Sequence, residues 1–108
     1  MAPHDYEEAL TLPTSLVGDG EFFALRVRGD SMIEAAICDG DIVVVRRQPT
    51  AESGEIVAAT VGGETTVKVL DLADGRVRLL PRNPHYSPID AGDATILGRV
   101  VSILRRLR

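Results

Sequence analysis

The chain has 108 residues, a hydrophobic fraction of 44% and a formal net charge of −4 at pH 7. This length fits a single domain over residues 1–108 with its own core. The acidic balance disfavours direct binding of nucleic acid, which depends on basic side chains that displace counterions from phosphates. No apolar run is long enough to cross a bilayer, and the acidic N-terminal residues do not resemble a signal peptide. We therefore expect a cytoplasmic protein without a membrane contact.

Metal and cofactor chemistry finds little support in the sequence. The single cysteine, Cys38, has no second thiol for a disulfide or a zinc site. Asp30, Asp39 and Asp41 lack the layout of a calcium-binding loop, and His85 lies in a proline-flanked loop. We therefore predict neither a metal nor a cofactor, and we interpret Cys38 as a small hydrophobic residue.

Short strands are predicted for most of the first half of the chain. Residues 1–20 are acidic and interrupted by proline and glycine, which indicates an irregular lead-in with at most a short ordered piece. A strand is expected over residues 22–28, followed by a helical turn over residues 31–38. The unbroken branched run over residues 42–45 predicts a strand that is buried on both faces.

The second half of the chain predicts hairpins. Gly62-Gly63 and Asp74-Gly75 are typical of tight turns with positive φ, which glycine tolerates. Further strands are expected over residues 55–61, 64–72, 76–80 and 95–104. Six or seven short, mostly antiparallel strands without a convincing amphipathic helix predict an all-β domain.

Ser31 and Lys68 are the first candidates for catalysis. Ser31 follows Gly29 in a turn, and Lys68 lies in a strand that is otherwise apolar. A lysine amine held away from water can lose its proton near neutral pH and then deprotonate a serine hydroxyl. Because side chains alternate along a strand, Thr66 would share the face of Lys68 and could orient its amine.

Each candidate also has an ordinary structural explanation. Lys68 could point outward from its strand, with its stem packed and its charge in water. Ser31 could cap a short helix after the turn. The basic residues near the C-terminus are expected to form a solvated strand end, and they are Arg99, Arg105, Arg106 and Arg108.

Three short segments together resemble the C-terminal peptidase domain of LexA repressors. They are Gly-Asp-Ser-Met at 29–32, Asp-Gly-Asp at 39–41 and Thr-Val-Lys at 66–68. The resemblance covers about residues 12–101 and extends to UmuD-like mutagenesis proteins, phage repressors and, more distantly, signal peptidases. It implies a small β-domain of the LexA and signal-peptidase type.

The resemblance also implies roles for single residues and a partner. Ser31 would be the nucleophile of a serine endopeptidase and Lys68 its neutral general base. The backbone amides of Asp30 and Ser31 would form the oxyanion hole. In that family the pair cleaves an Ala-Gly bond of the repressor itself, stimulated by an activated RecA filament, in the SOS response to DNA damage.

One departure from the family pattern affects the expected activity. LexA repressors carry a DNA-binding helix-turn-helix before this domain, with the cleaved Ala-Gly bond in the connecting region. The sequence contains no helix-turn-helix pattern, and Ala91-Gly92 lies far downstream in a loop. We therefore expect that this chain cannot cleave itself at the family position. The alternative is a dimeric interaction module like processed UmuD, whose catalytic pair is idle.

The last predicted strand favours a homodimer. Residues 95–104 carry apolar side chains on both alternating faces, and such a strand at a sheet edge would expose unpaired backbone groups. Ile96 and Val100 are expected on one face, and Leu97, Val101 and Ile103 on the other. Antiparallel pairing with the same strand of a second copy would place these residues at a two-fold interface. The alternative is a monomer in which the N-terminal lead-in covers this strand.

Overall fold

The computed structural model describes residues 7–8 and 20–107. They form one eight-stranded sheet in the order β1-β2-β3-β8-β4-β5-β6-β7, in which every neighbouring pair is antiparallel. The strands are β1 (Glu7–Glu8), β2 (Phe22–Arg26), β3 (Ile42–Arg47), β4 (Ile56–Val61), β5 (Glu64–Ala73), β6 (Arg76–Leu80), β7 (Ile89–Asp90) and β8 (Thr95–Leu104). The predicted all-β fold is confirmed.

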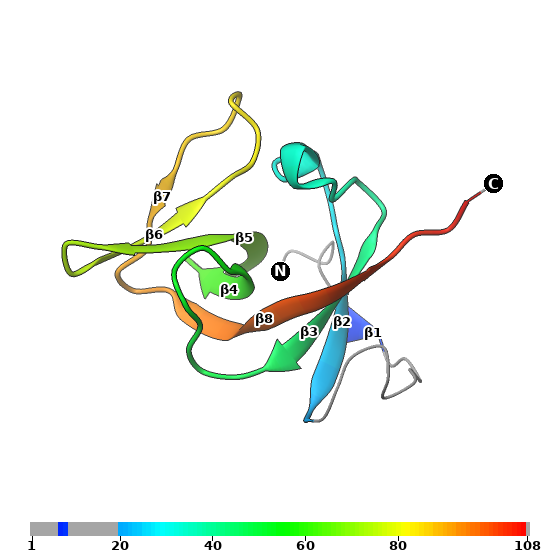
Figure 1. Cartoon of the computed structure of the whole chain (residues 1–108), viewed down its shortest axis with the longest axis horizontal. Coiled ribbons are helices and arrows are strands. Elements are labelled where there is room, and N and C mark those ends of the chain that lie inside the picture. Colours follow the sequence, from blue (N-terminus) through cyan, green and yellow to red (C-terminus); the bar gives the residue numbers. More distant parts are fainter. Residues whose placement is uncertain (1–6, 9–19, 108) are drawn as a thin grey trace.

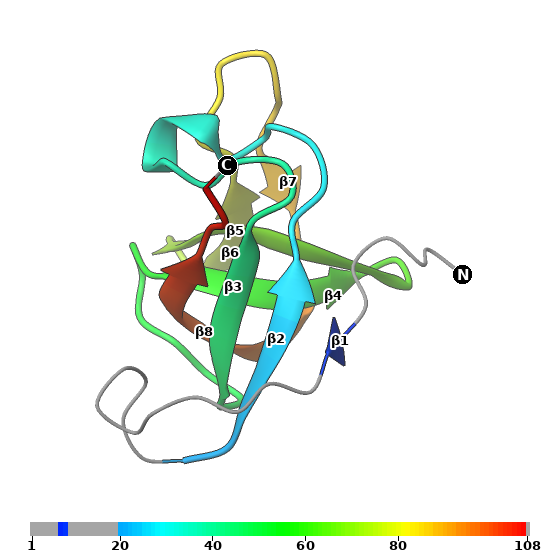
Figure 2. The same ribbon diagram turned by 90° about the vertical axis from the view of Figure 1, so that its right-hand side faces the viewer.

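The sheet has two parts that β8 joins (Figure 1). We call β1, β2 and β3 the serine half, because the loop between β2 and β3 carries Ser31. We call β4, β5, β6 and β7 the lysine half, because β5 carries Lys68. Figure 2 shows β2 and β3 side by side in front of the lysine half, whose strands run across them.

The expectation that the last strand lies at the edge of the sheet is wrong. β8 pairs with β3 through residues 98–104 and with β4 through residues 95–99, so it lies in the middle of the strand order. Beyond Arg99 its pairing with β4 ends and its pairing with β3 continues. In the described part of the lead-in, Glu7–Glu8 pairs with β2 and not with β8, and residues 1–6 and 9–19 lie outside the description.

Two bulges in β8 change which of its side chains share a face. The pairing with β3 skips Val101, and the pairing with β4 skips Leu97. An extra residue in one strand interrupts the strict alternation of side chains. Leu97 and Val100, expected on opposite faces, consequently pack against the same core cluster.

Gly98 marks the closest approach between β8 and β3. A Cβ atom at this position would lie 2.7 Å from Val45 Cγ1 and closer still to the carbonyl oxygen of Arg46. Only glycine leaves room for a neighbouring backbone at such a distance. The junction between the two halves therefore depends on the missing side chain at this position.

Both predicted tight turns are confirmed in the lysine half. Gly62 and Gly63 have φ angles of +58° and +82°, and Asp74 and Gly75 have +55° and +72°. Positive φ at both central positions is the signature of a type I′ turn, whose twist matches that of the flanking strands. The other expected boundaries shift slightly, since the first strand ends at Arg26 and the helical turn is the short 3₁₀ segment η2 (Ile33–Ala35).

Two clusters of buried side chains form the core. The first lies between the serine half and the inner strands of the lysine half, and its buried members are Phe23, Leu25, Val27, Met32, Ile37, Val43, Val45, Ala58 and Val69. The second lies within the lysine half, and its buried members are Val57, Ala59, Leu70, Leu79 and Ala91. Residues 43–45 are fully buried, which confirms a strand covered on both faces. Of the helical segments in the described ranges, none has the length and hydropathy of a membrane span.

Candidate active site

Ser31 lies in the loop that connects β2 to β3, residues 27–41, which we call the serine loop. Its base is closed by two backbone hydrogen bonds: the Val27 N–H donates to the Asp41 carbonyl at 2.8 Å, and the Gly40 N–H donates to the Val27 carbonyl at 2.9 Å. Met32, directly after Ser31, is 2% exposed and belongs to the first core cluster. Met32 thus packs the serine loop against the core.

A second loop, residues 81–88 between β6 and β7, holds the serine loop from the lysine half. We call it the clamp loop. The Arg82 N–H donates to the Ser31 carbonyl, and the Glu34 N–H donates to the Arg82 carbonyl, both at 2.8 Å. The backbone from Ser31 to Glu34 is therefore anchored to a segment that is remote in sequence.

Lys68 lies on β5 opposite Val57 of β4. Its side chain belongs to the buried class, with the residue 9% exposed, and Nζ donates a hydrogen bond to Thr66 Oγ1 at 2.6 Å. This burial does not fit the alternative of an outward-facing lysine whose charge lies in water. The position of Thr66 two residues earlier on the same strand places its hydroxyl within reach of the amine.

Ser31 and Lys68 line one small cavity of about 40 Å³ between the serine loop and β5. Its lining residues are Val27, Arg28, Ser31, Met32, Thr66, Val67 and Lys68. A polar cavity of this size has room for about one water molecule. The fold thus brings the two candidate residues together from different halves of the sheet, and their catalytic roles stay predictions.

Two backbone donors are available at Ser31, which lines this cavity, and at the residue before it. Within the described residues, the N–H groups of Asp30 and Ser31 have no hydrogen-bond acceptor. The carbonyl of Asp30 is in contrast occupied, because it accepts hydrogen bonds from Asn83 Nδ2 at 2.9 Å and from the Ile33 N–H at 3.2 Å. Free N–H groups next to a nucleophile can stabilise negative charge on a carbonyl oxygen.

The prediction of a solvated basic end is wrong for Arg105, which binds the serine loop. Its guanidinium donates to both carboxylate oxygens of Asp41 at 2.8 Å and to the Ala36 carbonyl at 2.7 Å. The Asp41 side chain is 3% exposed, and the hydrogen bond from Arg105 holds the pKa of its carboxyl below the usual value. Arg99 also has a partner, with its Nε 3.6 Å from Glu55 Oε2. Sequence position alone had not indicated that Arg105 closes the far end of the serine loop.

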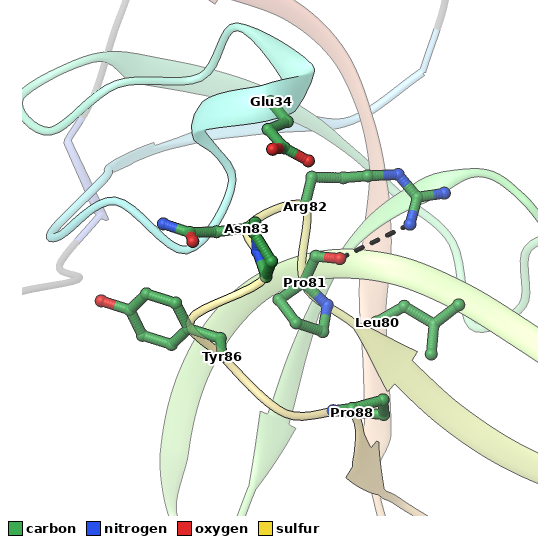
Figure 3. Close-up of a pocket in the computed structure, with 8 residues that line it drawn as sticks. Glu34, Leu80, Pro81, Arg82, Asn83, Tyr86 and Pro88 are labelled. Carbon is green, nitrogen blue, oxygen red and sulfur yellow. Dashed lines mark hydrogen bonds between the residues drawn. The ribbon is translucent and has the colours of Figure 1, made fainter.

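Asn83 and Tyr86 of the clamp loop are the residues near the site that the sequence analysis missed. Both contact Asp30, through Asn83 Nδ2 at 2.9 Å and through the Tyr86 hydroxyl, which donates to Asp30 Oδ1 at 2.7 Å. A groove of about 350 Å³ is also lined by this loop, together with Leu80 and Glu34 (Figure 3). The prolines of the loop restrict its backbone and were the available signal for a fixed structure.

The weaker candidates have structural explanations. The His85 N–H donates to Asn83 Oδ1 at 2.9 Å, inside the clamp loop, and the His85 side chain is exposed. Cys38 is half-buried, with its sulfur 3.4 Å from Arg105 Nη2. Across residues 7–8 and 20–107, no group of three or more His, Cys, Asp or Glu side chains could hold a metal ion.

Comparisons with known proteins agree on one family. A family model described as Peptidase S24-like matches residues 1–101. The chain is 61% identical over 107 residues to the LexA repressor of Nocardioides sp., covering 99% of this chain and 44% of that protein. It is also 61% identical to the LexA repressor of Streptomyces coelicolor and to LexA repressor 1 of Nocardia farcinica, covering 46% and 50% of them. The chain spans about half the length of the curated relatives it matches, and it belongs to the Peptidase S24-like family.

Proposed function

We propose that this chain is the C-terminal peptidase domain of a LexA-type repressor, with Ser31 and Lys68 as its catalytic pair. One observation carries the proposal: Ser31 and the buried amine of Lys68 line the same cavity of about 40 Å³. Membership of the Peptidase S24-like family and identities of 61% to LexA repressors support it. A LexA-type repressor acts on DNA inside the cell, so a cytoplasmic location is part of the proposal.

The proposed reaction begins with proton transfer from Ser31 to Lys68. Burial penalises the ammonium ion, and the neutral amine can then accept the serine proton. Ser31 Oγ attacks the carbonyl carbon of the scissile bond, whose oxygen becomes an oxyanion held by the N–H groups of Asp30 and Ser31. The C–N bond breaks as Lys68 returns the proton to the leaving amine. Water, deprotonated by Lys68, then hydrolyses the acyl ester and restores Ser31.

Thr66 has an orienting role in this mechanism. Its hydroxyl accepts a hydrogen bond from Lys68 Nζ at 2.6 Å, which restricts the rotation of a long and flexible side chain. A neutral lysine has no tautomer to select, so the pair needs no third acidic residue of the kind that orients a catalytic histidine.

Cleavage in trans tests the proposed function. The substrate is a peptide that contains the Ala-Gly segment of LexA repressors, and the rate should rise with pH as the neutral form of Lys68 becomes more populated. Ser31→Ala and Lys68→Ala should each abolish cleavage. Arg76→Ala serves as the matched control, because Arg76 forms an exposed ion pair with Asp90 and should leave the rate unchanged. Cleavage that survives either catalytic substitution removes the proposal, and a wild-type domain that does not cleave the peptide favours the idle, UmuD-like module instead.

Stimulation by an activated RecA filament is part of the same proposal for the full-length repressor. A filament accelerates cleavage only if it binds the cleavage-competent conformation more tightly than the others. Cleavage of a full-length protein that carries this domain should therefore be faster with RecA, single-stranded DNA and nucleotide than without them. An unchanged rate contradicts this part of the proposal.

A homodimer is the proposed assembly, with a narrower interface than the sequence suggested. Ile96, Leu97 and Val100 pack against the core clusters. Val101, which the bulge displaces, and Ile103, which is 41% exposed, stay available to a second copy. Val101→Asp and Ile103→Asp should each convert a dimer to a monomer in sedimentation at micromolar concentration. A monomeric wild-type protein, or a dimer that neither substitution affects, contradicts the proposal.

A further inference from the structure

Two side chains of the clamp loop converge on Asp30, the residue before Ser31. Asn83 Nδ2 donates to the Asp30 carbonyl at 2.9 Å, and the Tyr86 hydroxyl donates to the Asp30 carboxylate at 2.7 Å. Both side chains extend from their loop to the same side, away from Leu80 and Pro88 (Figure 3). Asn83 is 7% exposed, and buried asparagines are uncommon unless their hydrogen bonds are satisfied.

The contact between Asn83 and Asp30 fixes more than one carbonyl. The C=O of Asp30 and the N–H of Ser31 belong to one planar trans peptide unit, so the two groups point in opposite directions. A donor that holds the Asp30 oxygen consequently also sets the direction of the Ser31 N–H. An oxyanion hole is effective only when its donors are oriented before the reaction.

Asn83 is itself held in one orientation. Its Oδ1 accepts the His85 N–H at 2.9 Å, and its backbone carbonyl accepts the Tyr86 N–H at 3.0 Å. Because Oδ1 is engaged inside the clamp loop, the amide group Nδ2 is the part that faces Asp30. The clamp loop therefore presents a pre-oriented donor to the peptide unit of Ser31.

Tyr86 binds the carboxylate of Asp30. A carboxylate one position from the nucleophile would repel the negative charge that develops on the substrate oxygen. The hydrogen bond from Tyr86 keeps the Asp30 carboxylate on the clamp loop, and Asp30 in turn raises the pKa of the Tyr86 hydroxyl, which therefore stays a donor. Asp30 is thus held at its backbone by one clamp residue and at its side chain by the other.

We infer that Asn83 is a positioning residue, which orients the Ser31 N–H as an oxyanion donor, with Tyr86 as a second and weaker support. This inference rests on the proposed function. It predicts that the loss of the Asn83 donor weakens binding of the transition state and leaves binding of the substrate almost unchanged.

Kinetics of cleavage in trans test the inference. Asn83→Asp keeps the oxygen that accepts the His85 N–H and removes the donor, and Asn83→Ala removes the donor without adding charge. Each should lower kcat by about 10- to 100-fold, because removing an oxyanion donor altogether costs roughly 10²–10³-fold. KM should change less than about threefold. Tyr86→Phe should lower kcat by a smaller factor, and Arg76→Ala is the control, because Arg76 forms an exposed ion pair with Asp90 outside the clamp loop.

A transition-state analogue separates positioning from a structural role. A peptide boronic acid forms a tetrahedral adduct with the serine, whereas binding of the intact peptide to the Ser31→Ala protein reports the ground state. Asn83→Ala should lower the affinity for the boronic acid by about the same factor as kcat and leave the affinity for the intact peptide unchanged. The inference is overturned if the two affinities fall equally, if KM alone rises, or if kcat is unchanged.

The outcomes also distinguish this inference from the proposed function. Cleavage that survives Ser31→Ala removes the proposed function itself. Cleavage that requires Ser31 but keeps its kcat in both Asn83 variants removes only the positioning role. If Asn83→Ala does not fold, Asn83→Asp and Tyr86→Phe still test the positioning role, since both keep the shape of the replaced side chain.

Discussion

Ser31 and Lys68 share a cavity, but the chain holds them in different ways. Lys68 lies in the β4–β5 hairpin, and its hydrogen-bond acceptor Thr66 is two positions away on the same strand. Ser31 lies in a loop whose anchors are remote: Asn83 and Tyr86 lie 53 and 56 positions from Asp30, and Arg105 lies 64 positions from Asp41. The candidate base Lys68 is positioned by local contacts, and the candidate nucleophile Ser31 is positioned by long-range polar contacts.

This difference indicates which part of the site should tolerate substitutions elsewhere in the chain and which part should not. A strand ladder fixes Lys68 through many backbone hydrogen bonds, so a distant substitution has little effect on it. The buried apolar anchors of the serine loop are Val27, Met32 and Ile37, and single side chains complete its polar contacts. Substitutions at those side chains should therefore disturb Ser31 without disturbing Lys68.

The largest expected effect is that of Lys68→Met, which should lower the cleavage rate without lowering the stability of the fold. Lys68→Met removes the proposed general base and should lower cleavage by roughly 10²–10⁴-fold or more. The free energy of unfolding should stay the same or rise, because an apolar side chain of similar length avoids the desolvation of a buried amine. Urea denaturation compared with the cleavage rate gives both quantities. A loss of stability that matches the loss of activity would mean that Lys68 is structural.

A smaller effect is expected where β8 joins the two halves. Gly98→Ala places a Cβ against the backbone of Arg46 and should lower the free energy of unfolding by about 3 kcal/mol, as overpacking of tight sites does. Gly92→Ala is the matched control, because its Cβ would meet no atom within 4 Å. Equal unfolding midpoints of the two variants would contradict the close approach at this junction.

The far end of the serine loop should be less costly to break. Asp41→Ala removes the acceptor of the Cys38 N–H and the carboxylate that pairs with Arg105, and it should cost about 2 kcal/mol of unfolding free energy. Asp93→Ala in an exposed turn should be close to neutral. Arg105→Ala should shift stability in the same direction as Asp41→Ala, and Arg106→Ala should not. A double variant at both positions should cost less than the sum of the single ones.

The smallest effect is the dependence of stability on pH through Asp41. The pKa of its carboxyl is lowered in the folded protein by Arg105, so its contribution is complete above the unfolded pKa of about 3.9. It is lost as the pH falls through the folded pKa, because the protonated carboxyl no longer pairs with Arg105. The free energy of unfolding should fall less steeply below pH 5 in Asp41→Asn than in the wild type. Parallel curves would assign the acid sensitivity to other carboxylates.

Local features of the fold could be predicted from the sequence. Gly62-Gly63 and Asp74-Gly75 specify their turns through residues that tolerate positive φ, and the branched run over 42–45 specifies a strand whose residues 43–45 are buried. The central position of β8 could not be predicted in this way, because its partners β3 and β4 lie far away along the chain. The same limit explains the missed residues Asn83, Tyr86 and Arg105, whose contacts with the serine loop span more than fifty positions.

The place of β8 in the sheet has a consequence for synthesis of the protein. β8 follows all the other described strands in the chain, yet its ladders with β3 and β4 join the two halves. A nascent chain can form the β2–β3 and β4–β5–β6 pairs early, but β3 and β4 keep open edges until residues 95–104 emerge from the ribosome. Open edges invite pairing with other chains, so this interval is the one most exposed to aggregation. We therefore expect Ser31 and Lys68 to come together late, after the strands that flank the serine loop and the strand that carries Lys68 have been made.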